Sequence, residues 1–470
     1  MDEYFDKVRE PFVADIQHWI SLKSEKGEPE PGFPFGKEPA EVLEAALLRA
    51  AEMGFAVRNY ENYVGVVSFI DAPVHLDILA HLDVVPADEK DWCLCKPYEP
   101  VVKDGRIYGR GAIDDKGPAV AALYAMKAVK DLGIPIRKNV RLILGTDEEC
   151  GSSDIEYFYE REREAPMTFT PDADFPLTNV EKGRLASGFF ASFGESEVLP
   201  RVLSVDGGMK LNVVPGEAEA ELEGLTKSEI APVLTAVQGE SGVRFVVESL
   251  ADDSSCSVPR VRILASGKAG HAAVPEDANN ALTGLLALLC NLPLADCEGL
   301  RCLRGVAALF PHGDWLGEAA GVRQEDDLSG PLTMSLNKFH YDIQALQCEF
   351  DSRCPLCATD ENVRLVLREN GAKRGLEMMD AVMDPPHHVP ADSHFVQTLL
   401  GIYTEYTGLE GSCAAIGGGT YVHDVQNGVA FGCAFPETNY RLHGADEFCV
   451  ISEMILSAKM FAEAIIRLCS

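Results

Sequence analysis

Three short segments of the chain carry side chains of the types that bind metal ions, and each follows a predicted strand. The stretch HLDVVP at 81–86 holds a histidine and an aspartate, and GRGAIDDKGP at 109–118 holds two adjacent aspartates. GTDEECG at 145–151 adds two adjacent glutamates after the apolar run 140–144. Because ligands recur at three strand ends, the pattern predicts a hydrolytic site with two metal ions.

Such a site needs an imidazole, a bridging carboxylate and further ligands, and it leaves a shared water with a lowered pKa. His81, Asp114 and Glu149 can supply the first three ligands. Asp83, two residues after His81, would point to the same side of an extended segment and could orient the imidazole. A lone histidine is more often a hydrogen-bonded structural residue, so the prediction depends on the whole set.

The neighbouring glutamates Glu148 and Glu149 repel one another unless a cation or water offsets their charge. One can be a ligand while the other acts on the water, whereas an isolated pair of this kind would usually be two solvated acids. The stretch PDADFP at 171–176 supplies further acids, and His443 lies just before a predicted helix. Together these residues complete a plausible ligand count.

The elements that position these residues are those of an α/β sheet. Periodicity predicts a helix over 39–53, two strands across 56–70, a buried strand over 76–81 and a helix over 116–132. Gly117 and Pro118 open the last helix, so its positive end faces the aspartate pair at 114–115 and helps to keep it ionised.

After residue 182 the pattern changes to alternating strands with one intervening helix at 278–292, which indicates a second, α+β unit. From residue 385 the α/β pattern returns, with a glycine-rich loop at 417–421, a strand over 429–435 and a closing helix at 450–468. We therefore expect a discontinuous α/β catalytic domain with an inserted α+β lid domain. The predicted boundaries are 1–183 and 386–470 for the catalytic domain and 184–385 for the lid.

Composition excludes several classes of function. The net charge of −33 opposes binding to nucleic acid or to anionic lipid, and no segment suits a membrane span. The 14 cysteines and an N-terminus without a signal-like apolar core favour a reducing cytoplasm. Two cysteine pairs, at 93–95 and 354–357, invite a zinc-knuckle interpretation, but only the second has the usual spacing, so incidental thiols are favoured.

The motifs resemble those of the PepV-type dipeptidases, within the larger group of dinuclear metallopeptidases that includes carboxypeptidase G, aminoacylases and carnosinases. The resemblance covers nearly the whole chain. Seven ordered matches carry it: HLDVVP at 81–86, YGRGAIDDKGP at 108–118, GTDEECGSSD at 145–154, PDADFP at 171–176, NVVP at 212–215, GKAGHAAVP at 267–275 and GGGTY at 417–421.

This resemblance implies two divalent metal ions, with zinc expected first and manganese or cobalt as alternatives. Each metal would have two ligands of its own, and one carboxylate would bridge both. The implied roles are His81 and Asp172 on one metal, Glu149 and His443 on the other, Asp114 as the bridge, Asp83 as support for His81, and Glu148 as the general base.

The resemblance also assigns roles outside the metal site. His271 on the lid would stabilise the oxyanion, while Asn212 and Arg353 would contact the substrate. In the glycine-rich loop, Gly418, Gly419 and Thr420 would receive the substrate's C-terminal carboxylate through backbone N–H groups. The family pattern continues with Ala-Arg after this loop, whereas this chain has Val-His at 422–423, a departure that bears on substrate range.

The expected activity is hydrolysis of dipeptides with a free N-terminus. The alternative enzyme is an N-acyl amino acid hydrolase, which shares the dinuclear site but has no free amine to recognise. A catalytically silent ligand-sensing protein on the same fold is the alternative from another class. The expected partner is the small dipeptide alone, and a lid enlarged by the insertion favours a monomer.

Overall fold

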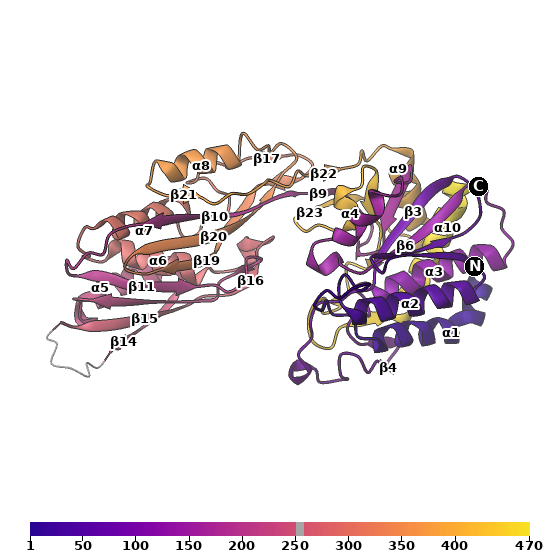
Figure 1. Ribbon diagram of the computed structural model, residues 1–470, viewed down its shortest axis with the longest axis horizontal. Helices are drawn as coiled ribbons and strands as arrows, with labels where there is room; N and C mark the ends of the chain where they lie inside the picture. Colours follow the sequence, from indigo (N-terminus) through magenta and orange to yellow (C-terminus); the bar gives the residue numbers. More distant parts are fainter. Residues whose placement is uncertain (251–257) are drawn as a thin grey trace. The chain divides into compact units, whose positions relative to one another are not determined.

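The computed structural model describes residues 1–250 and 258–470. The chain forms two compact units (Figure 1). The first combines Met1–Val180 with His387–Ser470, and the second is the continuous segment Glu181–Pro386. The fold is therefore mixed α/β, with one unit assembled from both ends of the chain.

A nine-stranded sheet forms the centre of the first unit, in the order β1-β2-β6-β3-β7-β24-β9-β22, with β23 paired to β9. Its middle is parallel, because β3 runs parallel to both β6 and β7, and β7 runs parallel to β24. The strands are β1 Ala56–Tyr60, β2 Val64–Ser68, β3 Val74–His81, β6 Asn139–Gly145, β7 Met167–Thr170, β9 Leu177–Glu181, β22 His387–His388, β23 Cys413–Ile416 and β24 Gly428–Ala430.

Helices cover both faces of this sheet, which explains why β3 and β6 are buried along most of their length. Successive side chains of a strand point to opposite faces, so Ile78 and Leu142 pack with the core of the large helices, while Leu79 and Ile143 pack with α4. The helices are α1 Asp2–Ser21, α2 Lys37–Glu52, α3 Lys116–Asp131, α4 Ser153–Tyr159, α9 His394–Thr407 and α10 Ile451–Cys469. Helices α1, α2 and α3 lie side by side (Figure 1).

A small three-stranded sheet joins distant parts of the first unit. Strand β5, Arg106–Tyr108, pairs with β4, Val101–Lys103, on one side and with β26, Phe448–Val450, on the other. The register places Phe448 opposite Tyr108. This ladder brings the segment before Asp114 beside the segment after His443. A second short pairing joins β8, Ala173–Asp174, to β25, Cys433–Ala434.

The second unit contains an eight-stranded antiparallel sheet in the order β14-β15-β13-β11-β19-β20-β10-β21. Four helices pack with it around one apolar core. The strands are β10 Gly183–Ser192, β11 Arg201–Gly207, β13 Glu217–Glu223, β14 Arg244–Ser249, β15 Arg260–Ser266, β19 Thr333–Tyr341, β20 Ala345–Cys354 and β21 Glu377–Met378. The helices are α5 Lys227–Ser241, α6 Ala281–Asn291, α7 Glu298–Leu309 and α8 Arg364–Ala372.

Two short ladders complete the second unit. Strand β12, Val213–Val214, pairs with β16, Gly270–His271, and β17, Glu325–Asp326, pairs with β18, Gly330–Pro331. The first of these ladders sets Val213 opposite His271. It therefore joins two of the motifs singled out in the sequence.

Most elements that the sequence predicts are present within a few residues. The strand predicted over 429–435 is divided instead into β24 and β25, because Gly432 between them has a φ of +79°. Helix α1 was not predicted, although it buries Phe5, Phe12 and Trp19 on one face. None of the described helices is long and apolar enough to cross a bilayer, and every described cysteine is a free thiol.

Candidate metal centre and catalytic site

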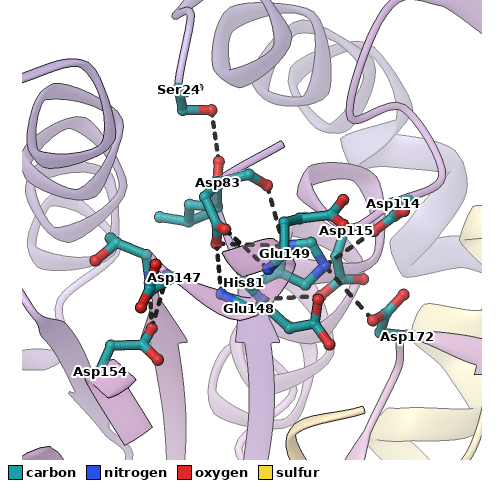
Figure 2. Close-up of polar contacts among 12 residues, drawn as sticks. Ser24, His81, Asp83, Asp114, Asp115, Asp147, Glu148, Glu149, Asp154 and Asp172 are labelled. Carbon is teal, nitrogen blue, oxygen red and sulfur yellow. Dashed lines mark hydrogen bonds and ion pairs between the residues drawn. The ribbon is translucent and has the colours of Figure 1, made fainter. Parts of the chain in front are cut away.

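The carboxyl ends of neighbouring strands in the first unit gather the predicted ligands at one edge of the sheet. His81 is the last residue of β3, directly opposite Gly145 at the end of β6. Glu148 and Glu149 form a short helical turn after β6, and Asp172 follows β7. Figure 2 shows these side chains converging with Asp114, which lies just before α3.

Asp114 lies between the two candidate histidine ligands. Its Oδ1 is 2.9 Å from His81 Nε2, and its Oδ2 is 2.8 Å from His443 Nε2. Asp172 Oδ2 lies 3.5 Å from the first histidine, and Glu149 Oε1 lies 3.4 Å from the second. Each oxygen of one carboxylate thus faces a different imidazole, which is the geometry that a bridging ligand requires.

The ring of His81 is oriented by the backbone. Its Nδ1 lies 3.0 Å from the carbonyl oxygen of Asp83, which can only accept, so Nδ1 carries a proton. The other nitrogen, Nε2, therefore presents a lone pair to the carboxylates in the neutral ring. The backbone N–H of His81 donates to Asp115 Oδ2 at 3.1 Å, which fixes the end of the strand.

The carboxylate of Asp83 lies closer to the turn of Glu148 and Glu149 than to the imidazole of His81. It accepts hydrogen bonds from the backbone N–H groups of Glu148 and Glu149, at 3.2 and 3.1 Å, whereas its Oδ1 is 3.5 Å from His81 Nδ1 (Figure 2). The sequence predicted an orienting role toward His81 alone. The structure adds a role in holding the two glutamates.

The electrostatics of the cluster favour bound cations. Burial raises the pKa of Glu148 well above its usual value, and the neighbouring acids Asp172, Glu149 and Asp114 raise it further. Burial and nearby carboxylates likewise raise the pKa values of Glu149 and Asp172. These shifts report carboxylates that lack enough positive charge around them.

The donor set fits divalent metal ions. Two triads each have ligand atoms within 4.8 Å of one another, His81 with Asp114 and Asp172, and Asp114 with Glu149 and His443. Within the described part of the chain, His81 Nε2 and Glu149 Oε1 are buried yet make no hydrogen bond of good geometry. Two lone-pair atoms buried in this way, each facing a carboxylate or imidazole, are what two ions would satisfy.

The predicted residues of the second unit fall into two places. His271 lies on β16 opposite β12, and the N–H of Ala273 donates to its Nδ1 at 3.2 Å. The N–H of Ala272 donates to the carbonyl of Asn212 at 2.9 Å, so the asparagine, which directly precedes β12, lies beside the end of β16. Arg353 lies on β20 and pairs with Asp351, its Nε 2.7 Å from Oδ1.

The glycine-rich loop precedes a short helical turn, η4, at Tyr421–Asp424. The hydroxyl of Thr420 accepts a hydrogen bond from the N–H of Val422 and caps this turn. A Cβ built on Gly418 meets no atom within 4 Å, so the loop backbone is open at that point. The departure at His423 lies in the same turn.

Four buried residues around the site were not predicted. Arg110 and Glu447 form an ion pair between the loop of Asp114 and the loop of His443. Asp154 and Tyr421 are joined by a hydrogen bond beside the segment that leads into the turn of Glu148 and Glu149. Arg110, Asp154 and Tyr421 occur within the quoted motifs, and Glu447 lies four residues after His443, so their position was a signal. Their partners lie hundreds of residues away, and no spacing rule could pair them.

A sheet whose parallel central strands gather one imidazole and several carboxylates at their carboxyl ends, beside a second imidazole from the loop of His443, is typical of a metal-dependent hydrolase. The sequence pattern of "Peptidase family M20/M25/M40" matches residues 78–467, and the chain belongs to this family of metallopeptidases. This match confirms the family that the resemblance predicted. The names of similar proteins support the PepV-type dipeptidase group within it.

Relatives that span almost the whole chain carry dipeptidase names. The Bacillus subtilis protein named "Putative dipeptidase YtjP" is 32% identical over 98% of this chain and 97% of its own length. The "Beta-Ala-Xaa dipeptidase" of Lactobacillus delbrueckii subsp. lactis is 30% identical over 99% of this chain and 97% of its own length.

Solved structures share the fold at lower identity. Human carnosine dipeptidase 1 matches with a TM-score of 0.58 and 18% identity, covering 99% of this chain and 97% of its own. An M20 family metallo-carboxypeptidase of Sulfolobus solfataricus matches with a TM-score of 0.59 and 16% identity, covering 97% and 98%. Both matches extend through the two units of this chain.

Proposed function

We propose that this protein is a metal-dependent dipeptidase that hydrolyses dipeptides with a free N-terminus. The observation that carries the proposal is the position of Asp114, with one carboxylate oxygen beside His81 and the other beside His443. Two relatives at 30% identity or more, matched almost from end to end, have dipeptidase names and support the substrate class.

In this proposal the first unit is the catalytic domain, and it holds two divalent ions. His81 and Asp172 are ligands of one ion, Glu149 and His443 are ligands of the other, and Asp114 bridges them. Imidazole and carboxylate ligands suit zinc, which we propose as the metal, and they also accept manganese or cobalt. When bound, the ions lower the pKa of a shared water and polarise the peptide carbonyl.

Glu148 is the proposed general base. It accepts the proton of the attacking water and passes it to the leaving amine. Its adjacent position to Glu149 on the turn, fixed by Asp83, keeps its carboxyl on the ligand side of the site (Figure 2). Its raised pKa suits a group that must hold a proton between the two steps.

The second unit supplies the proposed lid residues. Because His271 Nδ1 accepts from the N–H of Ala273, the neutral ring carries its proton on Nε2 and can donate it to an oxyanion. Asn212, directly before the adjoining strand β12, and Arg353 are proposed to contact the substrate. For Arg353 this requires its guanidinium to share its charge between Asp351 and a substrate carboxylate.

The proposed preference for dipeptides over longer peptides comes from binding both ends of the substrate. Gly418, Gly419 and Thr420 would receive the C-terminal carboxylate, and acids near the metals would receive the free ammonium group. We further propose that the enlarged lid leaves the protein monomeric, in keeping with the sequence-based expectation.

The test measures the rates at which the protein, loaded with Zn²⁺, cleaves a set of matched substrates. Ala-Ala and a β-Ala-Xaa dipeptide should be cleaved, whereas Ala-Ala-Ala and N-acetyl-Ala-Ala should be cleaved at least about tenfold more slowly, which corresponds to about 1.4 kcal/mol. Faster cleavage of an N-acetyl amino acid than of Ala-Ala would replace the proposal with the N-acyl amino acid hydrolase. An inactive protein that still binds two ions would favour a ligand-sensing role.

A further inference from the structure

A buried ion pair joins the loops that carry two of the proposed ligands of one metal. Arg110 Nη1 lies 2.5 Å from Glu447 Oε2, and the two residues are 3% and 0% exposed. Arg110 precedes Asp114 by four positions, and Glu447 follows His443 by four. Each partner of the ion pair therefore belongs to a different ligand loop.

The contacts of this pair extend to the ligand residues themselves. Arg110 Nη2 donates to the carbonyl oxygen of His443 at 3.1 Å. Glu447 Oε1 accepts from the backbone N–H of Ile113 at 3.0 Å and from that of Asp114 at 3.4 Å. One arginine and one glutamate thus hold the backbone of both ligand residues. The pairing of β5 with β26 joins the same two segments of the chain a few residues further along.

The His443 loop needs such support. His443 has a φ of +57° and Arg441 a φ of +60°, a left-handed conformation that is costly outside glycine. The side chain of His443 is 51% exposed, so packing alone does not hold it. Asp446, with a φ of +55°, accepts from the N–H groups of Cys93 and Leu94 and fixes the far end of the loop.

Glu149, the other ligand on this metal, is held independently by Asp83. Loss of the ion pair would therefore move His443, and to a smaller degree Asp114, while leaving Glu149, His81 and Asp172 in place. We propose that Arg110 and Glu447 are positioning residues that preassemble the Asp114–Glu149–His443 metal site, so that their loss weakens one of the two ions selectively. This inference rests on the ligand set proposed above.

The same unit offers a matched control. Arg141 Nε and Nη2 bind Asp77 at 2.8 and 2.7 Å, and Nη2 also donates to the carbonyl of Arg163 at 2.8 Å. Like the pair at the site, this is a buried arginine that joins a carboxylate to a backbone carbonyl. Asp77 lies four residues before His81 on β3, so the control pair is about 13 Å along the strand from the ligand.

The experiment measures Zn²⁺ binding to the full chain after chelator treatment, by equilibrium dialysis over a range of free Zn²⁺. The unmodified chain should bind two ions. In Arg110→Lys, the single ammonium cannot reach Glu447 and the His443 carbonyl together. This variant should bind the ion of the Asp114–Glu149–His443 site about 10- to 100-fold more weakly. Glu447→Gln should act in the same direction, and Arg141→Lys should bind both ions normally with a lower melting temperature.

The outcomes separate this inference from the proposed ligand set. An unmodified chain that binds fewer than two ions overturns the ligand set. Two ions bound normally by both Arg110→Lys and Glu447→Gln overturn the positioning role alone, as does equal weakening in Arg141→Lys. Hydrogen exchange on the unmodified, chelator-treated chain gives a test that needs no variant: the Ile113 amide should be protected before metal is added, and rapid exchange there contradicts preassembly.

Discussion

The phenolic hydroxyl of Tyr421 donates a hydrogen bond to Asp154 Oδ2 at 2.5 Å, with both side chains buried. The same carboxylate oxygen accepts from the backbone N–H groups of Thr146 and Asp147, at 2.5 and 3.0 Å. A Cβ on Gly145 would lie 2.0 Å from the hydroxyl, so only glycine leaves room for it. The segment that leads into the turn with Glu148 and Glu149 is therefore tied to the last residue of the glycine-rich loop.

We predict that Tyr421→Phe lowers stability by about 1.5–3 kcal/mol, because a buried carboxylate loses one donor. It should also lower kcat for a dipeptide, because the turn loses one of its supports, while two ions remain bound. Tyr159→Phe is the control, since the Tyr159 hydroxyl donates to buried Asp77, at 3.2 Å, away from the turn. Equal losses of kcat in the two variants would show that the Tyr421 contact is only structural.

Glu148→Gln should retain the metal ions and lose turnover. The amide keeps the size of the side chain but cannot accept the proton of the attacking water, so kcat should fall by about 10²- to 10⁴-fold. Metal content by elemental analysis and steady-state kinetics on Ala-Ala measure the two effects separately. Turnover within a few-fold of the unmodified protein would remove Glu148 from the role of base.

Asp83→Asn distinguishes the two contacts of that residue. An amide can accept at one end only, so either the Glu148 or the Glu149 N–H loses its buried acceptor, at a cost of about 1–3 kcal/mol. The contact of His81 with the backbone carbonyl at position 83 remains. We expect kcat to fall with the His81 ion retained, and loss of that ion instead would assign the side chain mainly to His81.

Removal of metal should destabilise the first unit alone. All five proposed ligands lie in Met1–Val180 and His387–Ser470, so each bound ion should stabilise that unit by about 4 kcal/mol when free metal is 1,000-fold above its Kd. Hydrogen exchange with peptide resolution, with and without chelator, can assign the change to a unit. Similar loosening throughout Glu181–Pro386 would contradict this assignment.

The sequence by itself determined the types and order of the proposed ligands, the α/β class and the family, because side chains at strand ends and apolar periodicity are local properties. It predicted β3 and α3 nearly to the residue. It did not predict α1, and it did not anticipate the break between β24 and β25, where a positive φ at Gly432 interrupts an apolar run.

Only the tertiary structure decided which polar groups meet. Tyr421 and Asp154 are separated by 267 positions, and Arg110 and Glu447 by 337. It also decided that the Asp83 carboxylate accepts from the N–H groups of Glu148 and Glu149. The two oxygens of Asp114 likewise contact different histidines only in the folded chain. Contacts of this kind depend on how strands and loops pack in three dimensions, and the spacing of residues along the chain does not predict that packing.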